Sequence, residues 1–422
     1  MFPTPPPNLP PDPVTPVPLP PAHKIAMLGA TGLATLLAAL SMLGPFSIDA
    51  YLPAFPNIQA ALSATQIEVQ QTLTAYMLAF AVMVLWHGAL ADAFGRRNVI
   101  LVSLVVFAIG TLGCASAHSV HYLWVFRIMQ GVSAGAGVVV GRAIIRDLYS
   151  DAPAARLLSL VTMIFSIAPA IAPVLGGWIV KFFDWRTIFL ALLGYTIVLG
   201  WFCYKRLPET LPKEKRQPFN PGYVAQNYWA IFSSPLFHMK AGVVSANFAG
   251  MFLYIAAAPV MLPQHLHLGP DQFAWLFIPT VSGLFLGSLA ANRMAGKSSF
   301  GRQVALGFCF MLSAAGANVL YHLFMPPAVP WSVAPMFFYT FGSSLMAPAV
   351  TLLALDMFPH IRGTVASCQS FAVTLLGALV AGVIAPFLSH SVLWIASGQL
   401  AFALFSLALW AASRRYRRHR PA

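Results

Sequence analysis

Charged side chains are scarce in this sequence. Asp, Glu, Lys and Arg together make up 8% of its 422 residues, whereas 59% are hydrophobic and the mean hydropathy is +0.75. A water-soluble domain draws roughly a quarter of its residues from these four types. So few charges could not cover the surface of a soluble protein of this length. The sequence therefore predicts an integral membrane protein.

The residue patterns of metal sites, disulfide frameworks and common enzymes are also missing. The four cysteines each fall inside an apolar segment, without CxxC or Cys/His spacing, so no disulfide framework and no metal site is expected. There is no nucleophile elbow, no H-E-x-x-H and no G-x-x-x-x-G-K-[ST] phosphate loop. We expect neither an enzyme nor a cofactor, and no drive by ATP hydrolysis.

Basic residues outnumber acidic ones, 24 to 11, which gives a net charge of +13. In a soluble protein this excess would suggest binding to nucleic acid. Here the basic residues lie between hydrophobic stretches, where they set the orientation of the chain in the membrane. No nucleic-acid partner is expected.

Twelve mostly apolar runs reach the length of about 20 residues that a membrane span needs. They form two series of six, 25–48, 67–90, 98–117, 121–143, 156–182 and 186–204, then 237–262, 272–292, 303–325, 332–355, 364–388 and 392–412. This predicts an all-α fold of two six-helix bundles, over 25–204 and 237–412, joined by a cytoplasmic linker at 205–236. The proline-rich residues 1–24 are expected to be a disordered cytoplasmic tail, and 413–422 a basic one.

The connections between spans differ in charge. One alternate set, together with both tails, carries most of the Lys and Arg residues, whereas the other set holds only Lys181 and Arg186. Basic connections stay in the cytoplasm, so both termini are predicted to be cytoplasmic in an inner (plasma) membrane. An acid and a base also recur after spans 4 and 10, as two parallel repeats would produce: Asp147 with Arg156, and Asp356 with Arg362.

The turn between spans 2 and 3 reads Gly-Ala-Leu-Ala-Asp-Ala-Phe-Gly-Arg-Arg over residues 88–97. Glycines permit a tight turn, and the charged groups can bind neighbouring helix ends. The run resembles the G-x-L-x-D-x-x-G-R-[RK] signature of the major facilitator superfamily, with alanine at 89 and 93 where Pro and Arg are frequent. The resemblance implies a conformational latch formed by Gly88, Asp92, Gly95, Arg96 and Arg97. We expect Asp92 to meet the N-terminal end of span 11 near Gly363; a plain charged turn is the alternative.

Span 4 carries Arg127, Gln130 and Gly131, which resemble the R-x-x-Q-G motif of proton-linked members of that superfamily. An arginine inside a membrane helix costs roughly 2.5–3.5 kcal/mol on insertion scales, so it normally faces a partner or a wet cavity. Snorkelling of Arg127 to the outer membrane surface is the alternative.

Span 5 carries two prolines and two glycines close together: Pro169, Pro173, Gly176 and Gly177. Each proline removes a backbone hydrogen bond and bends the helix. The stretch resembles the antiporter motif of drug exporters, with Ala172 where glycine is usual, and it implies an antiporter kink. A general helix bend is the alternative.

Span 1 ends in the run D-x-Y-L-P-x-x-P at residues 49–56, and further short matches include Glu209-Thr210-Leu211-Pro212. Over residues 25–412 the chain is similar to the Bcr/CflA drug-resistance exporters, which are drug:proton antiporters. That resemblance implies the major facilitator fold and the partners of such a protein: a small-molecule drug or metabolite, protons and membrane lipid. We expect it to function as a monomer.

Asp49 and Arg127 are the predicted proton-coupling residues. Asp49 is the one carboxylate placed clearly at a span, and a carboxylate partly withdrawn from water can load and release a proton. Arginine stays protonated, so Arg127 would act by changing its separation from Asp49. The alternative is that Asp49 only caps the end of its helix.

Substrate-binding candidates are polar or amphipathic side chains in spans that the resemblance places around a central cavity. Large apolar cavities with a few polar groups suit lipophilic drugs. The candidates are Tyr51, Gln70, Thr74, Tyr76, Asn247, Tyr254 and Gln369. Each of them could instead form a hydrogen bond between helices.

The function predicted from these motifs is proton-coupled export of small-molecule drugs across the inner membrane. The alternative on the same fold is export of a cellular metabolite, amino acid or siderophore, since the coupling motifs report direction and driving force rather than cargo. A membrane component without transport activity, such as a sensor, is a third class.

Overall fold

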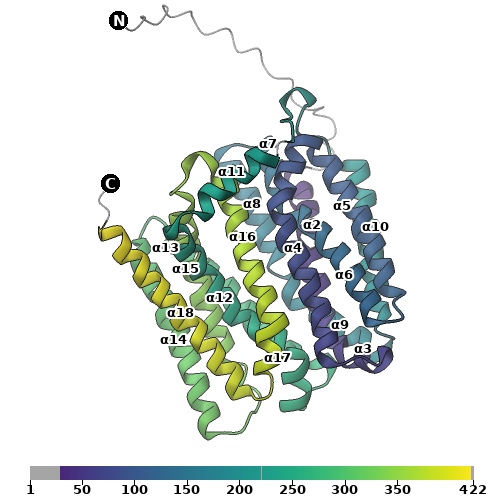
Figure 1. Ribbon diagram of the computed structural model, residues 1–422, viewed down its shortest axis with the longest axis vertical. Helices are drawn as coiled ribbons and strands as arrows, with labels where there is room; N and C mark the ends of the chain where they lie inside the picture. The colour runs from purple at the N-terminus through teal and green to yellow at the C-terminus, as the bar shows by residue number, and fades with distance from the viewer. Residues whose placement is uncertain (1–28, 220, 420–422) are drawn as a thin grey trace, which may run out of the picture.

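The computed structural model describes residues 29–219 and 221–419, and every regular element in this part of the chain is helical (Figure 1). Twelve helical segments within it are long and apolar enough to cross a membrane. The prediction of an all-α membrane protein with twelve spans is confirmed. The predicted tail at 1–24 lies outside the described residues.

The first six spans contain α2 (Gly29–Asp49), η1 (Leu52–Ala54), α3 (Phe55–Leu62), α4 (Gln66–Phe94), α5 (Arg96–Ala115), α6 (Val120–Ala134), α7 (Ala136–Leu148), α8 (Asp151–Phe165), α9 (Ala168–Phe182) and α10 (Arg186–Arg206). The connection to the second half contains η2 (Lys213–Lys215) and α11 (Pro221–Phe232). The last six spans contain α12 (Pro235–Val260), η3 (Met261–His265), η4 (Pro270–Gln272), α13 (Ala274–Met294), α14 (Phe300–Phe324), α15 (Pro335–Leu355), η5 (Pro359–Ile361), α16 (Arg362–Leu379), η6 (Val380–Ile384), α17 (Ala385–Leu388) and α18 (Val392–His419).

Several spans are interrupted or change their helical geometry, in some cases next to a proline. In span 5, α8 ends before α9 begins next to Pro169, whose ring nitrogen cannot donate a hydrogen bond. Span 4 divides at Gly135, and spans 7 and 11 contain the π-helical turns η3 and η6. Span 1 turns at η1, which contains Pro53, and continues as α3, past its predicted end at residue 48. Span 12 continues to His419.

The start of α4 shows how local chemistry sets a helix end. Thr65 is the N-cap: its hydroxyl accepts a hydrogen bond from the backbone N–H of Glu68 at 3.2 Å, and its own N–H donates to the Glu68 carboxylate at 2.7 Å. This reciprocal capping box satisfies two backbone donors that the first turn would otherwise leave free. The connection from α3 therefore ends sharply at Thr65.

Helices α2–α10 pack chiefly on one another and form the first bundle, and α12–α18 form the second bundle in the same way. The bundles meet where α4 lies along α16 and where α9 contacts α13 and η4 (Figure 1). We call the end of the molecule that carries α11 and the α4–α5 turn the α11 face. The opposite end, which carries α3 and α17, is the α3 face.

Candidate functional site

Arg127 lies in a polar cluster inside the first bundle. Its side chain is 0% exposed, on α6, one turn before Gly131. A Cβ atom at residue 131 would overlap the backbone carbonyl of Tyr76, so glycine lets α6 approach α4 closely. The Arg127 guanidinium then lies 4.4 Å from the ring centroid of Tyr76 and 4.8 Å from that of Tyr51.

Hydrogen bonds fix one edge of the Arg127 guanidinium and leave the rest open. Nη1 donates to the carbonyl and the hydroxyl of Ser47, both at 3.0 Å, and to Oε1 of Gln130 at 2.9 Å. Gln130 in turn donates to the hydroxyl of Thr111 at 2.8 Å. Nε and Nη2 of Arg127 are buried and have no partner among the described residues. Because an unpaired buried donor costs free energy, these two groups are poised to bind a further acceptor.

Asp49 ends α2, two residues after Ser47, and is 6% exposed. No hydrogen bond or ion pair joins its carboxylate to Arg127 or to another residue in the described part of the chain. The two predicted coupling residues are therefore buried near the same helix end but unpaired in this conformation. The burial of Arg127 also excludes snorkelling here.

The seven predicted substrate-binding residues fall into three groups. Tyr51 and Tyr76 belong to the Arg127 cluster, and the Tyr51 hydroxyl is hydrogen-bonded to that of Thr72 at 2.9 Å. Gln70 and Thr74 lie on the side of α4 that meets the second bundle. Asn247, Tyr254 and Gln369 contact helices of their own bundle through Met346, Asn318 and Thr351. The structure does not bring all seven to one place in this conformation.

Amide side chains of α4 join the two bundles toward the α3 face. Gln70 Nε2 donates to the carbonyl of Ala256 in α12 at 3.0 Å, and Gln71 Nε2 donates to the carbonyl of Gly382 in η6 at 2.8 Å. Thr74 lies directly against Gly382, where a larger residue would overlap it. Hydrogen bonds from side chains of α4 to backbone carbonyls of α12 and η6 thus hold the two bundles together.

The glycine pair of α9 extends this contact at the α3 face. Pro169 lies in the first turn of α9 and Pro173 within it. Gly176 packs on the backbone carbonyl of Ala50, and Gly177 packs on that of Pro270 in the second bundle. A Cβ atom at either glycine would overlap the carbonyl, so only glycine permits both approaches.

An ion pair completes the closure of the α3 face. Lys181 Nζ at the end of α9 lies 2.8 Å from Oδ2 of Asp271 in η4, and both side chains remain partly exposed. With the contacts of α4 and of the glycine pair, it holds the two bundles together at this end of the molecule.

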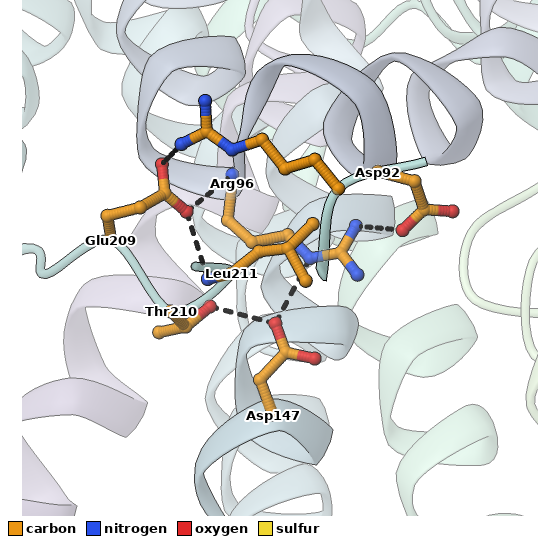
Figure 2. Close-up of polar contacts among 7 residues, drawn as sticks. Asp92, Arg96, Asp147, Glu209, Thr210 and Leu211 are labelled. Atoms are coloured by element: carbon orange, nitrogen blue, oxygen red, sulfur yellow. Dashed lines mark hydrogen bonds and ion pairs between the residues drawn. The ribbon is translucent and has the colours of Figure 1, made fainter. Parts of the chain in front are cut away.

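At the opposite end, Arg96 organises the predicted latch (Figure 2). Its guanidinium contacts two carboxylates: Nη1 lies 2.5 Å from Asp92 and Nε lies 3.1 Å from Asp147 at the end of α7. The hydroxyl of Thr210 donates to the same Asp147 oxygen at 2.8 Å. The side chain of Arg96 is largely buried, so these contacts tie α4, α5, α7 and the following linker together.

Glu209 adds a second anchor for the linker. Its Oε1 accepts from the backbone N–H of Arg96 at 2.9 Å and from that of Leu211 at 3.1 Å, and its Oε2 lies 3.5 Å from Arg216 (Figure 2). Gly95, at φ +95°, leaves the space that this carboxylate occupies, because a Cβ atom there would overlap it. The N–H groups at the start of α5 therefore face a negative charge, which stabilises a helix N-terminus.

Of the other predicted latch residues, only Asp92 had an expected partner. Asp92 pairs with Arg96, and no hydrogen bond or ion pair among the described residues joins it to Gly363, so the expected contact with span 11 is not made in this conformation. Arg97 donates to the carbonyl of Tyr204 at 2.8 Å and stacks on its ring. A Cβ atom added at Gly88 would meet only Val139, at 3.9 Å, so the packing at this position does not require glycine.

Helix α11 bridges the two bundles at the α11 face. The hydroxyl of Tyr228 donates to the carbonyl of Leu85 in α4, while Ile231 packs with Phe237 and Val365 of the second bundle. Burial raises the pKa of Tyr228 above its ordinary value, so the hydroxyl remains a donor at physiological pH.

Sequence reasoning missed the partners of the motif residues. Ser47 and Thr111 carry no signal of their own, because a hydroxyl in a membrane helix is common. Glu209 and Thr210 belong to a short stretch that matches the family, and Asp147 belongs to the acid and base that recur in the two halves. Nothing in the sequence shows that these three residues converge on Arg96.

Known membrane transporters resemble this chain in sequence. The model of the Major Facilitator Superfamily matches residues 35–381. An uncharacterized MFS-type transporter, YdgK of Bacillus subtilis, is 30% identical over 82% of this chain and 87% of its own length. A bicyclomycin resistance protein homolog of Haemophilus influenzae is 28% identical over 83% and 87%, and multidrug resistance protein D of Escherichia coli is 26% identical over 79% and 83%.

Solved structures agree at the level of the fold. The peptide transporter POT, crystallised with alafosfalin, superimposes with a TM-score of 0.71 at 15% identity, covering 94% of this chain and 96% of its own. A bacterial homolog of the lysosomal transporter Spinster, in an inward-facing conformation, gives 0.67 at 16% identity, covering 93% and 98%.

Proposed function

Because the chain belongs to the Major Facilitator Superfamily, and within it to the Bcr/CflA-type drug-resistance family, we propose that it exports small-molecule drugs in exchange for protons. Export of drugs is supported by the relatives named for bicyclomycin and multidrug resistance. Proton exchange is supported by one observation above all. Arg127 is fully buried with two nitrogens, Nε and Nη2, that have no hydrogen-bond partner among the described residues, and its Nη1 binds Ser47 at the helix end that carries Asp49.

The α11 face is the cytoplasmic face in this proposal. The α4–α5 turn, the linker at 205–236 and residues 414–420 carry half of the 24 Lys and Arg residues, as cytoplasmic segments of inner-membrane proteins do. The conformation closed at the α3 face is then the one in which drug enters from the cytoplasm. The bundles over 25–204 and 237–412 move as units, and one copy of the chain suffices.

Coupling follows from the geometry around Ser47. Arg127 is held to α2 through the Ser47 carbonyl and hydroxyl, which leaves Nε and Nη2 to receive a carboxylate. Exchange requires Asp49 to bind a proton from outside while the α3 face is open and the carboxylate lies away from Arg127. After that face has closed, a shift of the α2 end beside Gly176 brings the carboxylate to these nitrogens, and the proton leaves toward the cytoplasm as drug is taken up. The conformation described here, with the two groups apart, precedes this release.

Reconstitution tests this proposal. Purified protein in liposomes is given an imposed pH gradient and a panel of bicyclomycin-type, sulfonamide and phenicol drugs together with amino acids and siderophores. We expect drug accumulation driven by the gradient in the wild type. In Asp49→Asn, accumulation against a gradient should be lost, while exchange of labelled drug without a gradient continues.

Asp184→Asn is the control, because Asp184 lies at the exposed α9–α10 turn and pairs only with its neighbour Arg186. If Asp49→Asn concentrates drug as well as the wild type, Asp49 only caps α2 and the coupling assignment is wrong. If the pH gradient drove uptake of metabolites and of no drug, the cargo would be a metabolite.

A further inference from the structure

A groove lies between α14 and α18. These two helices stand on the outer side of the second bundle, away from the interface of the two bundles (Figure 1). Its volume is about 580 Å³. Its walls are mainly apolar, and its lining includes Phe308, Cys309, Leu312, Trp410, Arg414 and Arg415. It is thus an apolar cleft in the membrane-facing surface with positive charge at one end.

The groove has the depth of one membrane leaflet. Arg414 and Arg415 lie in the last turn of the apolar part of α18 that can cross a membrane, Val392–Tyr416. Arg415 lies eight positions after Leu407, a rise of about 12 Å, since an α-helix rises about 1.5 Å per residue. The hydrocarbon core of a bilayer is about 30 Å thick, so the groove runs from the membrane boundary almost to the midplane.

Charge gathers at the boundary end of the groove. Arg414 and Arg415 are exposed, and neither makes a hydrogen bond or ion pair with a described residue. Lys240 lies behind the groove wall, with its ammonium 5.4 Å from the ring centroid of Trp410. The sequence continues with Arg417, Arg418 and Arg420. Clusters of basic residues directly beside a membrane helix favour anionic lipid headgroups.

We propose that this groove binds one anionic phospholipid from the leaflet at the α11 face. The guanidiniums of Arg414 and Arg415 bind the headgroup phosphate, because an arginine presents several N–H donors that match phosphate oxygens. An acyl chain occupies the cleft over Phe308 and Leu312, where Trp410 forms part of the apolar wall. The site is independent of the proposed transport cycle, since it needs only that the chain spans a membrane.

Native mass spectrometry of the full-length protein tests the proposal. Protein in detergent is titrated with phosphatidylglycerol or phosphatidylcholine of identical acyl chains, and bound lipid is counted. We expect one phosphatidylglycerol to be retained in preference to phosphatidylcholine. Each arginine near a membrane surface contributes about a fivefold factor in binding an anionic lipid, so Arg414→Gln/Arg415→Gln should lower the affinity about 25-fold.

The matched control is Arg293→Gln/Lys297→Gln, which removes the same charge from the α11 face outside the groove, at the end of α13. The control should keep the preference for phosphatidylglycerol. An equal loss of phosphatidylglycerol affinity in both double variants would mean that net charge alone attracts the lipid. If the wild type retained phosphatidylglycerol and phosphatidylcholine equally, the site would not recognise the headgroup. Either result overturns the proposal.

Cys309 gives a second readout that does not depend on counting lipids. It is exposed and lines the groove, whereas Cys114, Cys203 and Cys368 are buried. In nanodiscs containing phosphatidylglycerol, alkylation of Cys309 by a membrane-permeant maleimide should be several-fold slower than in phosphatidylcholine alone, and Arg414→Gln/Arg415→Gln should abolish the difference. Inorganic phosphate should give no protection. Equal rates in both lipids would show that no acyl chain is held in the groove.

Discussion

The hydrogen atom that serves as the side chain of Gly177 is what lets two backbones meet at the α3 face. Gly177→Ala would push a methyl group into the carbonyl of Pro270 and separate α9 from η4. Overpacking of this kind typically costs about 1–3 kcal/mol, so the equilibrium population of the conformation closed at the α3 face, relative to the open one, should fall about 5- to 150-fold. Spin-label distances between Asn57 and His390, both exposed at this face, should lengthen.

Gly194→Ala is the matched control, because a Cβ atom at Gly194 of α10 would meet nothing within 4 Å. It should leave the distance distribution unchanged. If Gly177→Ala also leaves it unchanged, the contact with Pro270 does not hold the α3 face closed.

Arg127→Lys tests the charge of the Arg127 cluster separately from its geometry. Lysine keeps the positive charge near Ser47 but loses the planar stacking on Tyr51 and Tyr76. We expect gradient-driven transport to fall without being abolished, and Arg127→Ala to shift the pH optimum of transport and lower activity further. Rates of drug accumulation across a pH series measure both effects; identical profiles for the two variants would contradict a role for the charge.

At this scale the sequence favoured a buried Arg127 over one that snorkels, but it did not show which residues Arg127 binds. The cost of a membrane arginine already indicates a buried, paired group. Arg127 binds Ser47 and not Asp49 because of the way in which α2 ends and turns into η1. The residues after Asp49 are compatible with several kinds of turn, so the sequence does not decide between the two partners.

Among the helices, the linker takes part in the polar network around Arg96 through Thr210 and Glu209. Thr210→Val would keep the shape of the side chain and remove its hydrogen bond to Asp147. A hydrogen bond to a charged group is worth about 1.5–3 kcal/mol, so the variant should be less stable, with a lower Tm. Thr210→Ser, which keeps the hydroxyl, is the control and should stay near the wild type.

A thermal unfolding series by intrinsic fluorescence measures this difference, and transport rates from the same preparations show whether turnover falls with it. Equal Tm values for Thr210→Val and the wild type would mean that Arg96 alone satisfies Asp147.

The breaks within the spans were only partly predictable. Pro169 signals an interruption because proline cannot donate, and α9 does begin beside it. The division at Gly135 and the π turn η6 carry no such signal, since glycine also occurs inside continuous membrane helices. The carbonyl of Gly382 in η6 accepts from Gln71, so this turn matters for contact between the bundles.

For the whole molecule, orientation in the membrane is the broadest prediction. Ser119 caps α6 at the α3 face, and Lys213 lies in the linker at the α11 face; both are exposed. Cysteines substituted at these two positions should react with an impermeant maleimide from opposite sides of intact cells, with Ser119→Cys labelled from outside. Labelling of both from one side would overturn the topology.

The number of spans followed from hydropathy alone, because length and apolarity are local properties. Which face is closed could not follow, because the sequence is the same in every conformation of a transporter. The closed α3 face depends on contacts between residues far apart in the chain, such as Gln70 with Ala256.

The contacts that close the α3 face have an electrical consequence. Within the described chain they are mostly neutral: amide groups of Gln70 and Gln71 on carbonyls, and Gly177 on a carbonyl. Lys181 and Asp271 carry opposite charges and stay partly exposed at the edge. A membrane potential acts only on charge, with about 2.3 kcal/mol per elementary charge per 100 mV. Opening this face therefore moves almost no gating charge, and any voltage dependence of transport reports the charge on the cargo and on the protons exchanged for it.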